Sequence, residues 1–124
     1  MKSMFPALTL ALFAAPVLAD GVDIQWNEAG RFQHETTLKA GAVLEVCGKL
    51  PAQLGIDWSF ASSAPMEANI HYHEGKQVVF PAKHAAAAML KDRLNTKVAQ
   101  DYCWMWSNRS KQAVQIKLEL KKIS

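Results

Sequence analysis

The sequence predicts an all-β protein, an antiparallel β-sandwich of about seven or eight strands. Short segments with alternating apolar and polar residues recur along the chain, as in strands with one buried face. Turns that contain glycine separate many of these segments. The segment 100–108 places Tyr102, Trp104 and Trp106 on one face and two sulfur-containing residues on the other. A strand that is apolar on both faces is typical of the middle of a sandwich.

The amino terminus has the pattern of a secretory signal peptide. Lys2 precedes an apolar run that ends in the small-residue sequence Val17-Leu18-Ala19. The run is shorter than the roughly 20 residues that a membrane span needs, and no other run approaches that length. We therefore expect cleavage after residue 19, one domain over residues 20–124 without a membrane span, and export to the periplasm or beyond the cell.

The charge of the chain is mildly basic. Fourteen Lys and Arg residues against eleven Asp and Glu residues give a formal net charge of +3. These charges are interspersed along the chain, which does not favour a nucleic-acid partner. The partner is expected to be a protein or a small ligand, and the sequence does not identify it or fix the oligomeric state.

The expected strands follow from the alternation pattern. In chain order they lie at residues 22–26, 36–38, 43–48, 56–60, 68–73, 77–80, 100–107 and 114–120. Residues 74–76 contain Gly75 and predict a hairpin with a three-residue loop. The aromatic residues Trp58 and Trp104 are assigned to the core.

Residues 84–98 are ambiguous. The run Ala85-Ala86-Ala87-Ala88 and the four-residue spacing of Leu90, Leu94 and Val98 favour a helix over 84–94. The same spacing is even, however, so these residues also share one face of a strand. Composition alone favours the helix.

Two cysteines, Cys47 and Cys103, follow the predicted signal peptide. In an exported protein a pair of cysteines is interpreted first as one disulfide. Two free thiols or a metal-bound pair are the alternatives.

The order of these motifs resembles the GOLD (Golgi-dynamics) domain, a β-sandwich of early-secretory cargo receptors. The resemblance rests on the segments 43–47, 56–60, 69–76 and 102–108 and on the closing alternating strand. It implies a jelly-roll or GOLD-like sandwich, with extended chain from Leu90 onward and at most one helical turn at 84–89. In cargo receptors the later cysteine lies at the position of Met105, two residues after Cys103. Two residues are one strand period, so Cys103 points to the same face as that cysteine and could reach Cys47. The chain lacks their membrane span and coiled coil, so their transport role is not implied.

The strongest candidate for a metal site is the pair His71 and His73. Residues two apart on a strand project from the same side, where both imidazoles could hold one metal ion. His84 is the expected third ligand. The thioethers of Met66, Met89 and Met105 would favour copper. The alternative is that the histidines only line the outer face of the hairpin.

Enzyme motifs are lacking: the sequence contains no nucleophile elbow, phosphate loop or dinucleotide fingerprint. We therefore expect a non-catalytic exported binding module without a cofactor, and the alternative is a copper or other transition-metal binding protein. Trp106, beside a polar turn, is the expected surface contact for a ligand.

Overall fold

The computed structural model describes residues 19–123, which form seven β-strands and no helix. The strands are β1 (Ala19–Asp23), β2 (Arg31–Leu38), β3 (Val43–Leu50), β4 (Gly55–Glu74), β5 (Gln77–Asn95), β6 (Gln100–Ser107) and β7 (Val114–Lys122). The predicted all-β class and strand number are confirmed. In this part of the chain no helix is long and apolar enough to cross a membrane. The expected signal peptide lies almost wholly outside the described residues and stays a prediction.

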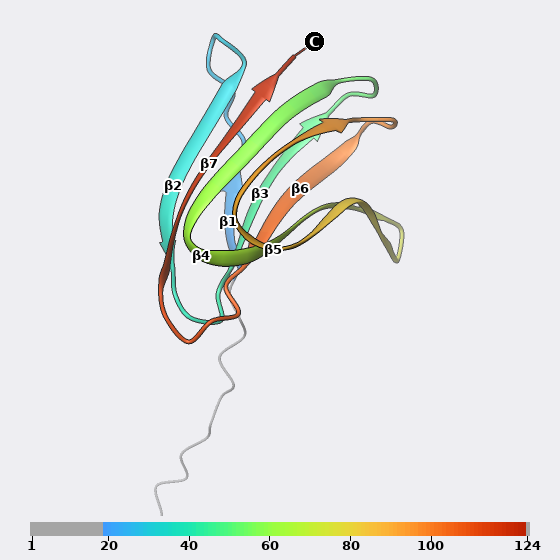
Figure 1. The fold of residues 1–124 in the computed structure, drawn as a ribbon. Coiled ribbons are helices and arrows are strands. Elements are labelled where there is room, and N and C mark those ends of the chain that lie inside the picture. Colours follow the sequence, from blue (N-terminus) through green and yellow to red (C-terminus); the bar gives the residue numbers. More distant parts are fainter. Residues whose placement is uncertain (1–18, 124) are drawn as a thin grey trace, which may run out of the picture.

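One continuous sheet is folded over into two layers, because β4 passes from one layer to the other (Figure 1). Its first half pairs with β7 through residues 56–62, and its second half pairs with β6 through residues 67–71. β5 follows β4 around the bend. The first layer is therefore β2, β7, the start of β4 and the end of β5. The second layer is β1, β3, β6, the end of β4 and the start of β5.

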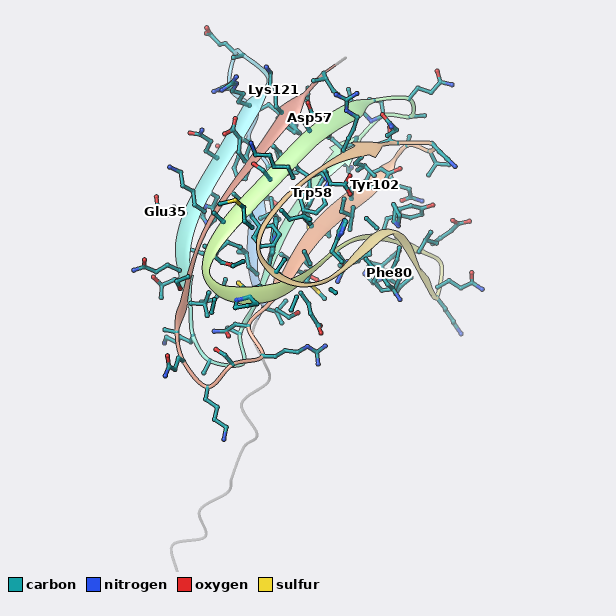
Figure 2. All side chains as sticks on the ribbon, in the orientation of Figure 1. Glu35, Asp57, Trp58, Phe80, Tyr102 and Lys121 are labelled. Carbon is teal, nitrogen blue, oxygen red and sulfur yellow. A yellow bond between two sulfur atoms is a disulfide. The ribbon has the colours of Figure 1, made fainter. Side chains whose placement is uncertain are left out.

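The core lies between the two layers. Trp58 and Phe60 of β4 meet Trp106 of β6 edge-on, with ring centroids 6.5 and 5.8 Å apart. Figure 2 shows Trp58 and Tyr102 within the curl of the sheet. The inward aromatic face predicted for β6 is confirmed, since Tyr102 and Trp104 are both buried. Trp58 and Trp104 therefore belong to the core, as predicted.

Asn108 holds the end of β6 against the turn after β2. It is 2% exposed, and its Nδ2 donates to the carbonyl oxygens of Leu38, Lys39 and Gln112 at 2.8–3.1 Å. Its Oδ1 accepts from the backbone N–H of Ser110 at 3.0 Å. A single buried amide thus satisfies backbone groups from two separate loops.

Three expectations about local structure are wrong. The first strand begins earlier, at Ala19, and pairs parallel to β3, so the sheet is not purely antiparallel. The β4–β5 hairpin has a two-residue loop, Gly75 and Lys76, because Glu74 pairs directly with Gln77. Gly75 has a φ of 60°, the sign that a type II′ turn needs at this position.

The third wrong expectation is the helix that composition alone favours over 84–94, because the whole segment, including the single helical turn that the resemblance allowed at 84–89, is extended chain in β5. Pairing with β4 extends along both halves of this strand, from Glu74↔Gln77 to Gly55↔Asn95. Hydrogen bonds to a neighbouring strand therefore override the local preference of an alanine-rich segment. The four alanines lie where the register with β4 shifts, at the bend between the layers. The extended chain implied from Leu90 onward is confirmed.

Candidate functional site

The disulfide lies on the outer face of the second layer. Cys47 of β3 and Cys103 of β6 are directly opposite in the antiparallel register, and their sulfurs are bonded. The predicted bridge is confirmed, and neither cysteine is free. His71 of β4 is the register partner of Cys103 on its other side. The outward face of the layer thus carries a row of Cys47, Cys103 and His71 across three strands.

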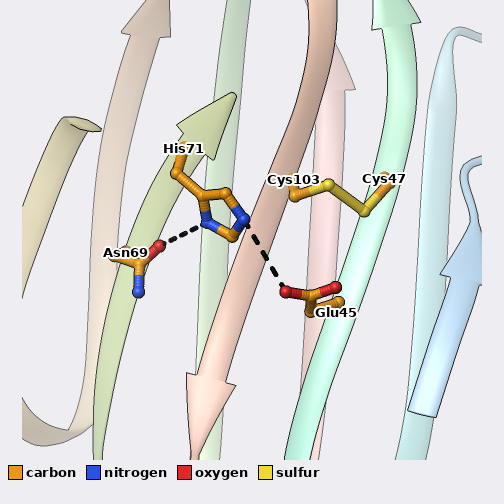
Figure 3. The surroundings of a disulfide bond; sticks show 5 residues. All are labelled: Glu45, Cys47, Asn69, His71 and Cys103. Atoms are coloured by element: carbon orange, nitrogen blue, oxygen red, sulfur yellow. Dashed lines mark hydrogen bonds and ion pairs between the residues drawn. A yellow bond between two sulfur atoms is a disulfide. The ribbon is translucent and has the colours of Figure 1, made fainter. Parts of the chain in front are cut away.

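His71 is surrounded by polar groups but is almost entirely buried (Figure 3). Its Nδ1 lies 2.8 Å from Oδ1 of Asn69, and its Nε2 lies 3.6 Å from Oε1 of Glu45. The ring is 5% exposed, although its position on the outer face predicts exposure to solvent. The cover comes from neighbouring strands, including the ring of Phe80 in β5 at 5.8 Å.

The surroundings of His71 favour its neutral form. Burial lowers the pKa of His71 below its ordinary value, and the neighbouring His73 acts in the same direction. The carboxylate of Glu45 opposes this shift without cancelling it. A neutral ring keeps a free nitrogen lone pair, which is the form of histidine that binds metals.

His73 and two apolar side chains extend this face along the hairpin. The rings of His73 and His71 are 5.6 Å apart. Val78 is the register partner of His73, so the two share one face. Val78 and Phe80 are 43% and 41% exposed. We call this surface, made of His71, His73, Val78 and Phe80, the hairpin face.

His84 lies in different surroundings. Its Nε2 is 2.9 Å from Oδ2 of Asp92, and its ring meets Trp58 edge-on at 5.5 Å. Asp92 and His84 are eight residues apart in β5, so this contact joins the two halves of the strand across its bend. His84 therefore faces inside the curl, whereas His71 and His73 face outward.

The expected three-histidine metal site is not assembled. In residues 19–123 the group of three or more His, Cys, Asp or Glu side chains with metal-ligand spacing is Glu45, Cys47 and Cys103, and the sulfurs of these cysteines are bonded to each other. Only the pair His71 and His73 remains of the predicted set.

Of the three predicted thioether ligands, only Met105 lies on a strand position next to the pair His71 and His73. Met66 lies in the core, and Met89 lies on the outer face of the first layer. Met105 is opposite both Glu45 and Asn69.

Trp106 is not a surface residue. Its side chain is 0% exposed and packs against Trp58 and Phe60. The expectation that it contacts a ligand at the surface is wrong, because the inward face of β6 is covered along its whole length. The exposed aromatic residue on this side of the molecule is Phe80. The alternation pattern predicts that Phe80 lies in the strand at 77–80 but does not predict its exposure. The signal for it is that Val78 and Phe80 share one face directly after a tight turn.

The outer face of the first layer is charged and largely self-neutralised. A groove of about 570 Å³ runs over Asp57, Arg93 and Glu119. Arg93 Nε donates to Asp57 at 2.8 Å, which lowers the pKa of that carboxyl group. Arg31 lies 3.4 Å from Glu119. Met89, which is 70% exposed, lines a second groove beside this one.

Comparisons with known proteins bear on the fold. No known protein family matches the sequence, and no curated protein sequence matches it. Aeromonas hydrophila PliG, a periplasmic lysozyme inhibitor of g-type lysozyme, has a similar structure, with a TM-score of 0.64 and 13% identity. The match covers 84% of this chain and 96% of that chain.

Two further solved structures have the same architecture. One is the pre-peptidase C-terminal domain of collagenase from Bacillus anthracis, with a TM-score of 0.63, 15% identity, and coverage of 86% of this chain and 97% of that chain. The other is PliG of Salmonella Typhimurium, with a TM-score of 0.62, 7% identity, and coverage of 85% and 99%. At these identities the likeness shows the fold alone. The GOLD resemblance is compatible with this fold and stays a prediction.

Proposed function

We propose that this protein is an exported, non-catalytic binding module whose partner is a protein, and that this partner is a lysozyme of the g-type class. One observation supports the proposal: the fold matches PliG inhibitors over 84–85% of this chain and 96–99% of theirs. The match spans a whole inhibitor chain, and a domain of a bacterial collagenase is matched to the same extent.

Three features of the chain support an exported binding protein. A disulfide is typical of an oxidising compartment outside the cytoplasm. The amino terminus has the pattern of a signal peptide. The hairpin face offers partly exposed apolar side chains beside charged ones, which is the composition of a protein interface.

The test is inhibition of purified lysozymes by purified residues 20–124. Lysis of a peptidoglycan suspension by g-type lysozyme should stop as the protein is titrated to equimolar amounts, whereas c-type lysozyme should remain active. Calorimetry should give one binding site. A g-type lysozyme that stays fully active in a large molar excess of the protein, with no heat of binding, would contradict the proposal. If the protein inhibits another class of lysozyme instead, its role as a binding module is retained and the proposed g-type target is wrong.

A second candidate function is binding of copper or another transition metal. It is favoured by the neighbouring rings of His71 and His73, 5.6 Å apart, and by Met105 beside Glu45 and Asn69 in the register. Copper titration should then saturate at one ion per chain and weaken as the pH falls through the histidine range near about 6.5. Replacement of His73 by Ala should weaken binding at least about tenfold, and replacement of His84 should not. Tight binding that survives the loss of both His71 and His73 would contradict this site.

A further inference from the structure

The β4–β5 hairpin projects beyond the sheet that supports it. Pairing of β4 with β6 ends at His71, whereas pairing of β4 with β5 continues to Glu74 and Gln77. The residues on either side of the turn therefore form a two-stranded ribbon with no third strand beside it. Figure 1 shows this hairpin reaching out past β6. A narrow projecting ribbon can enter a cleft that a flat sheet face cannot.

Two large apolar side chains are exposed side by side on the hairpin face. In the described part of the chain the large hydrophobic residues that are exposed are Val78, Phe80, Met89 and Val98. Val78 and Phe80 lie on the hairpin face. Val98 lines a groove of about 430 Å³ with Val79 and Pro81, on the opposite side of the hairpin. Val78 and Phe80 are therefore the pair that shares one face, and adjacent exposed apolar side chains mark an interaction surface more often than single ones do.

Phe80 is held in place before any partner binds. Its ring contacts the His71 ring at 5.8 Å, and the Nζ of Lys83 lies 4.3 Å from its centroid. His71 in turn is beside Cys103, whose disulfide ties β6 to β3. An exposed aromatic ring that already contacts its neighbours, above a disulfide-linked pair of strands, loses less conformational entropy on binding than a freely rotating side chain does.

The charges of the hairpin favour an acidic partner. Lys76 occupies the tip and Lys83 lies beside Phe80, whereas Glu74 is the single carboxylate between residues 71 and 84. Enzymes that cleave glycosidic bonds carry a pair of carboxyl groups in their substrate cleft. Cationic and aromatic groups on a narrow ribbon are complementary to such a cleft.

We propose that the hairpin face is the inhibitory surface, and that it enters the acidic substrate cleft of the glycan-cleaving enzyme. Phe80 is the apolar anchor, and Lys76 at the tip pairs with a carboxylate of the cleft. This assignment rests on the proposed lysozyme-inhibitor function and names the residues that perform it.

The outer face of the first layer provides matched controls. Met89 is more exposed than Phe80, and Lys91 lies near it in the same groove. Both are on the same strand as Phe80 but on the other side of the bend. Substitutions there change the same kinds of side chain without touching the hairpin.

The experiment measures the inhibition constant of the wild-type protein and of two pairs of variants. Phe80→Ala and Lys76→Glu should each raise the constant at least about tenfold. Met89→Ala and Lys91→Glu should leave it within about twofold of wild type. Thermal unfolding of each variant checks that the fold is retained. A chitin oligosaccharide that occupies the cleft should compete with the wild-type protein for the lysozyme.

The outcomes separate the two proposals. If the wild-type protein inhibits and the hairpin variants inhibit equally well, the hairpin assignment is overturned and the inhibitor function stands. Binding that the oligosaccharide does not weaken overturns insertion into the cleft. A third outcome is that the wild-type protein forms concentration-dependent dimers, that Phe80→Ala abolishes them, and that inhibition is unchanged. The hairpin face would then bind a second copy of this chain, and the inference would be overturned. If no lysozyme class is inhibited at all, both proposals fall.

Discussion

Strands β6 and β5 carry aromatic residues in opposite surroundings. β6 lies between β3 and β4, and its Trp104 and Trp106 are completely buried. β5 pairs with β4 alone, and its Phe80 is 41% exposed. Similar side chains therefore lie in different surroundings, because the tryptophans point between the two layers whereas Phe80 lies on the outward face of a strand with a single neighbour. The inward face of β6 stabilises the fold, whereas the outward face of β5 at Phe80 is exposed to solvent.

The largest expected effect is loss of a tryptophan from β6. Trp104→Ala should lower the free energy of unfolding by about 3–5 kcal/mol, because it leaves a large cavity between the layers. Trp58→Ala should behave similarly for the same reason. Denaturant titration followed by circular dichroism measures both.

A conservative variant sharpens this prediction. The Nε1 of Trp104 has no hydrogen-bond partner in the described part of the chain. Trp104→Phe keeps much of the ring and removes this buried donor, so it should cost clearly less than Trp104→Ala. Equal losses for the two variants would show that ring packing does not dominate at this position.

The disulfide is the next largest contribution. Its removal in the Cys47→Ser, Cys103→Ser double variant should lower stability by roughly 4 kcal/mol, because the unfolded chain regains the freedom of a loop closed by residues 56 apart. Denaturant titration with and without reductant should give the same difference for the wild-type protein. Titration of two thiols in unfolded, unreduced protein would show that the bridge does not form.

Asn108 provides a smaller test at the end of β6. Asn108→Ala should destabilise the fold by about 1–3 kcal/mol, because carbonyl groups of two loops lose their donor. Asn108→Asp keeps the acceptor for Ser110 but loses the donors, so it should not restore stability. A stability within about half a kcal/mol of wild type for Asn108→Ala would show that water replaces the amide.

The same contrast explains which features the sequence predicts. The two faces of β6 follow from its alternation, because Tyr102, Trp104 and Trp106 share one parity and the strand lies in the middle of its layer. The alanine run of β5 misleads, since its extended conformation depends on pairing with β4, which local composition does not encode. The burial of His71 is also hidden from the sequence. Its cover comes from Phe80 across a register shift and from Glu45 on a strand far away in sequence.

His71 should make stability depend on pH. Burial lowers its pKa in the folded protein, so the unfolded chain binds more protons as the medium becomes acidic. The contribution of neutral His71 to the free energy of unfolding is therefore fully present above the pKa of the unfolded chain, about 6.5. It is lost as the pH falls through the lower pKa of the folded protein.

Titration of the imidazole resonances by NMR measures this directly, and His71 should titrate below its ordinary range. The difference in unfolding free energy between wild type and His71→Gln should shrink from pH 7 to pH 5. A His71 that titrates above the ordinary value would show that Glu45 outweighs burial.

The smallest expected effect on stability is the most informative about β5. Phe80→Ala should change the free energy of unfolding by no more than about half a kcal/mol, because the ring is partly exposed and its contacts are to His71 and Lys83 at the surface. The same denaturant titration that shows a large loss for Trp104→Ala should detect almost none here.

Because Phe80 covers His71, its removal should also move the pKa of His71 back toward the ordinary value. A loss of several kcal/mol would place Phe80 with the tryptophans of β6, and an unchanged His71 titration would show that Phe80 is not the cover of that ring.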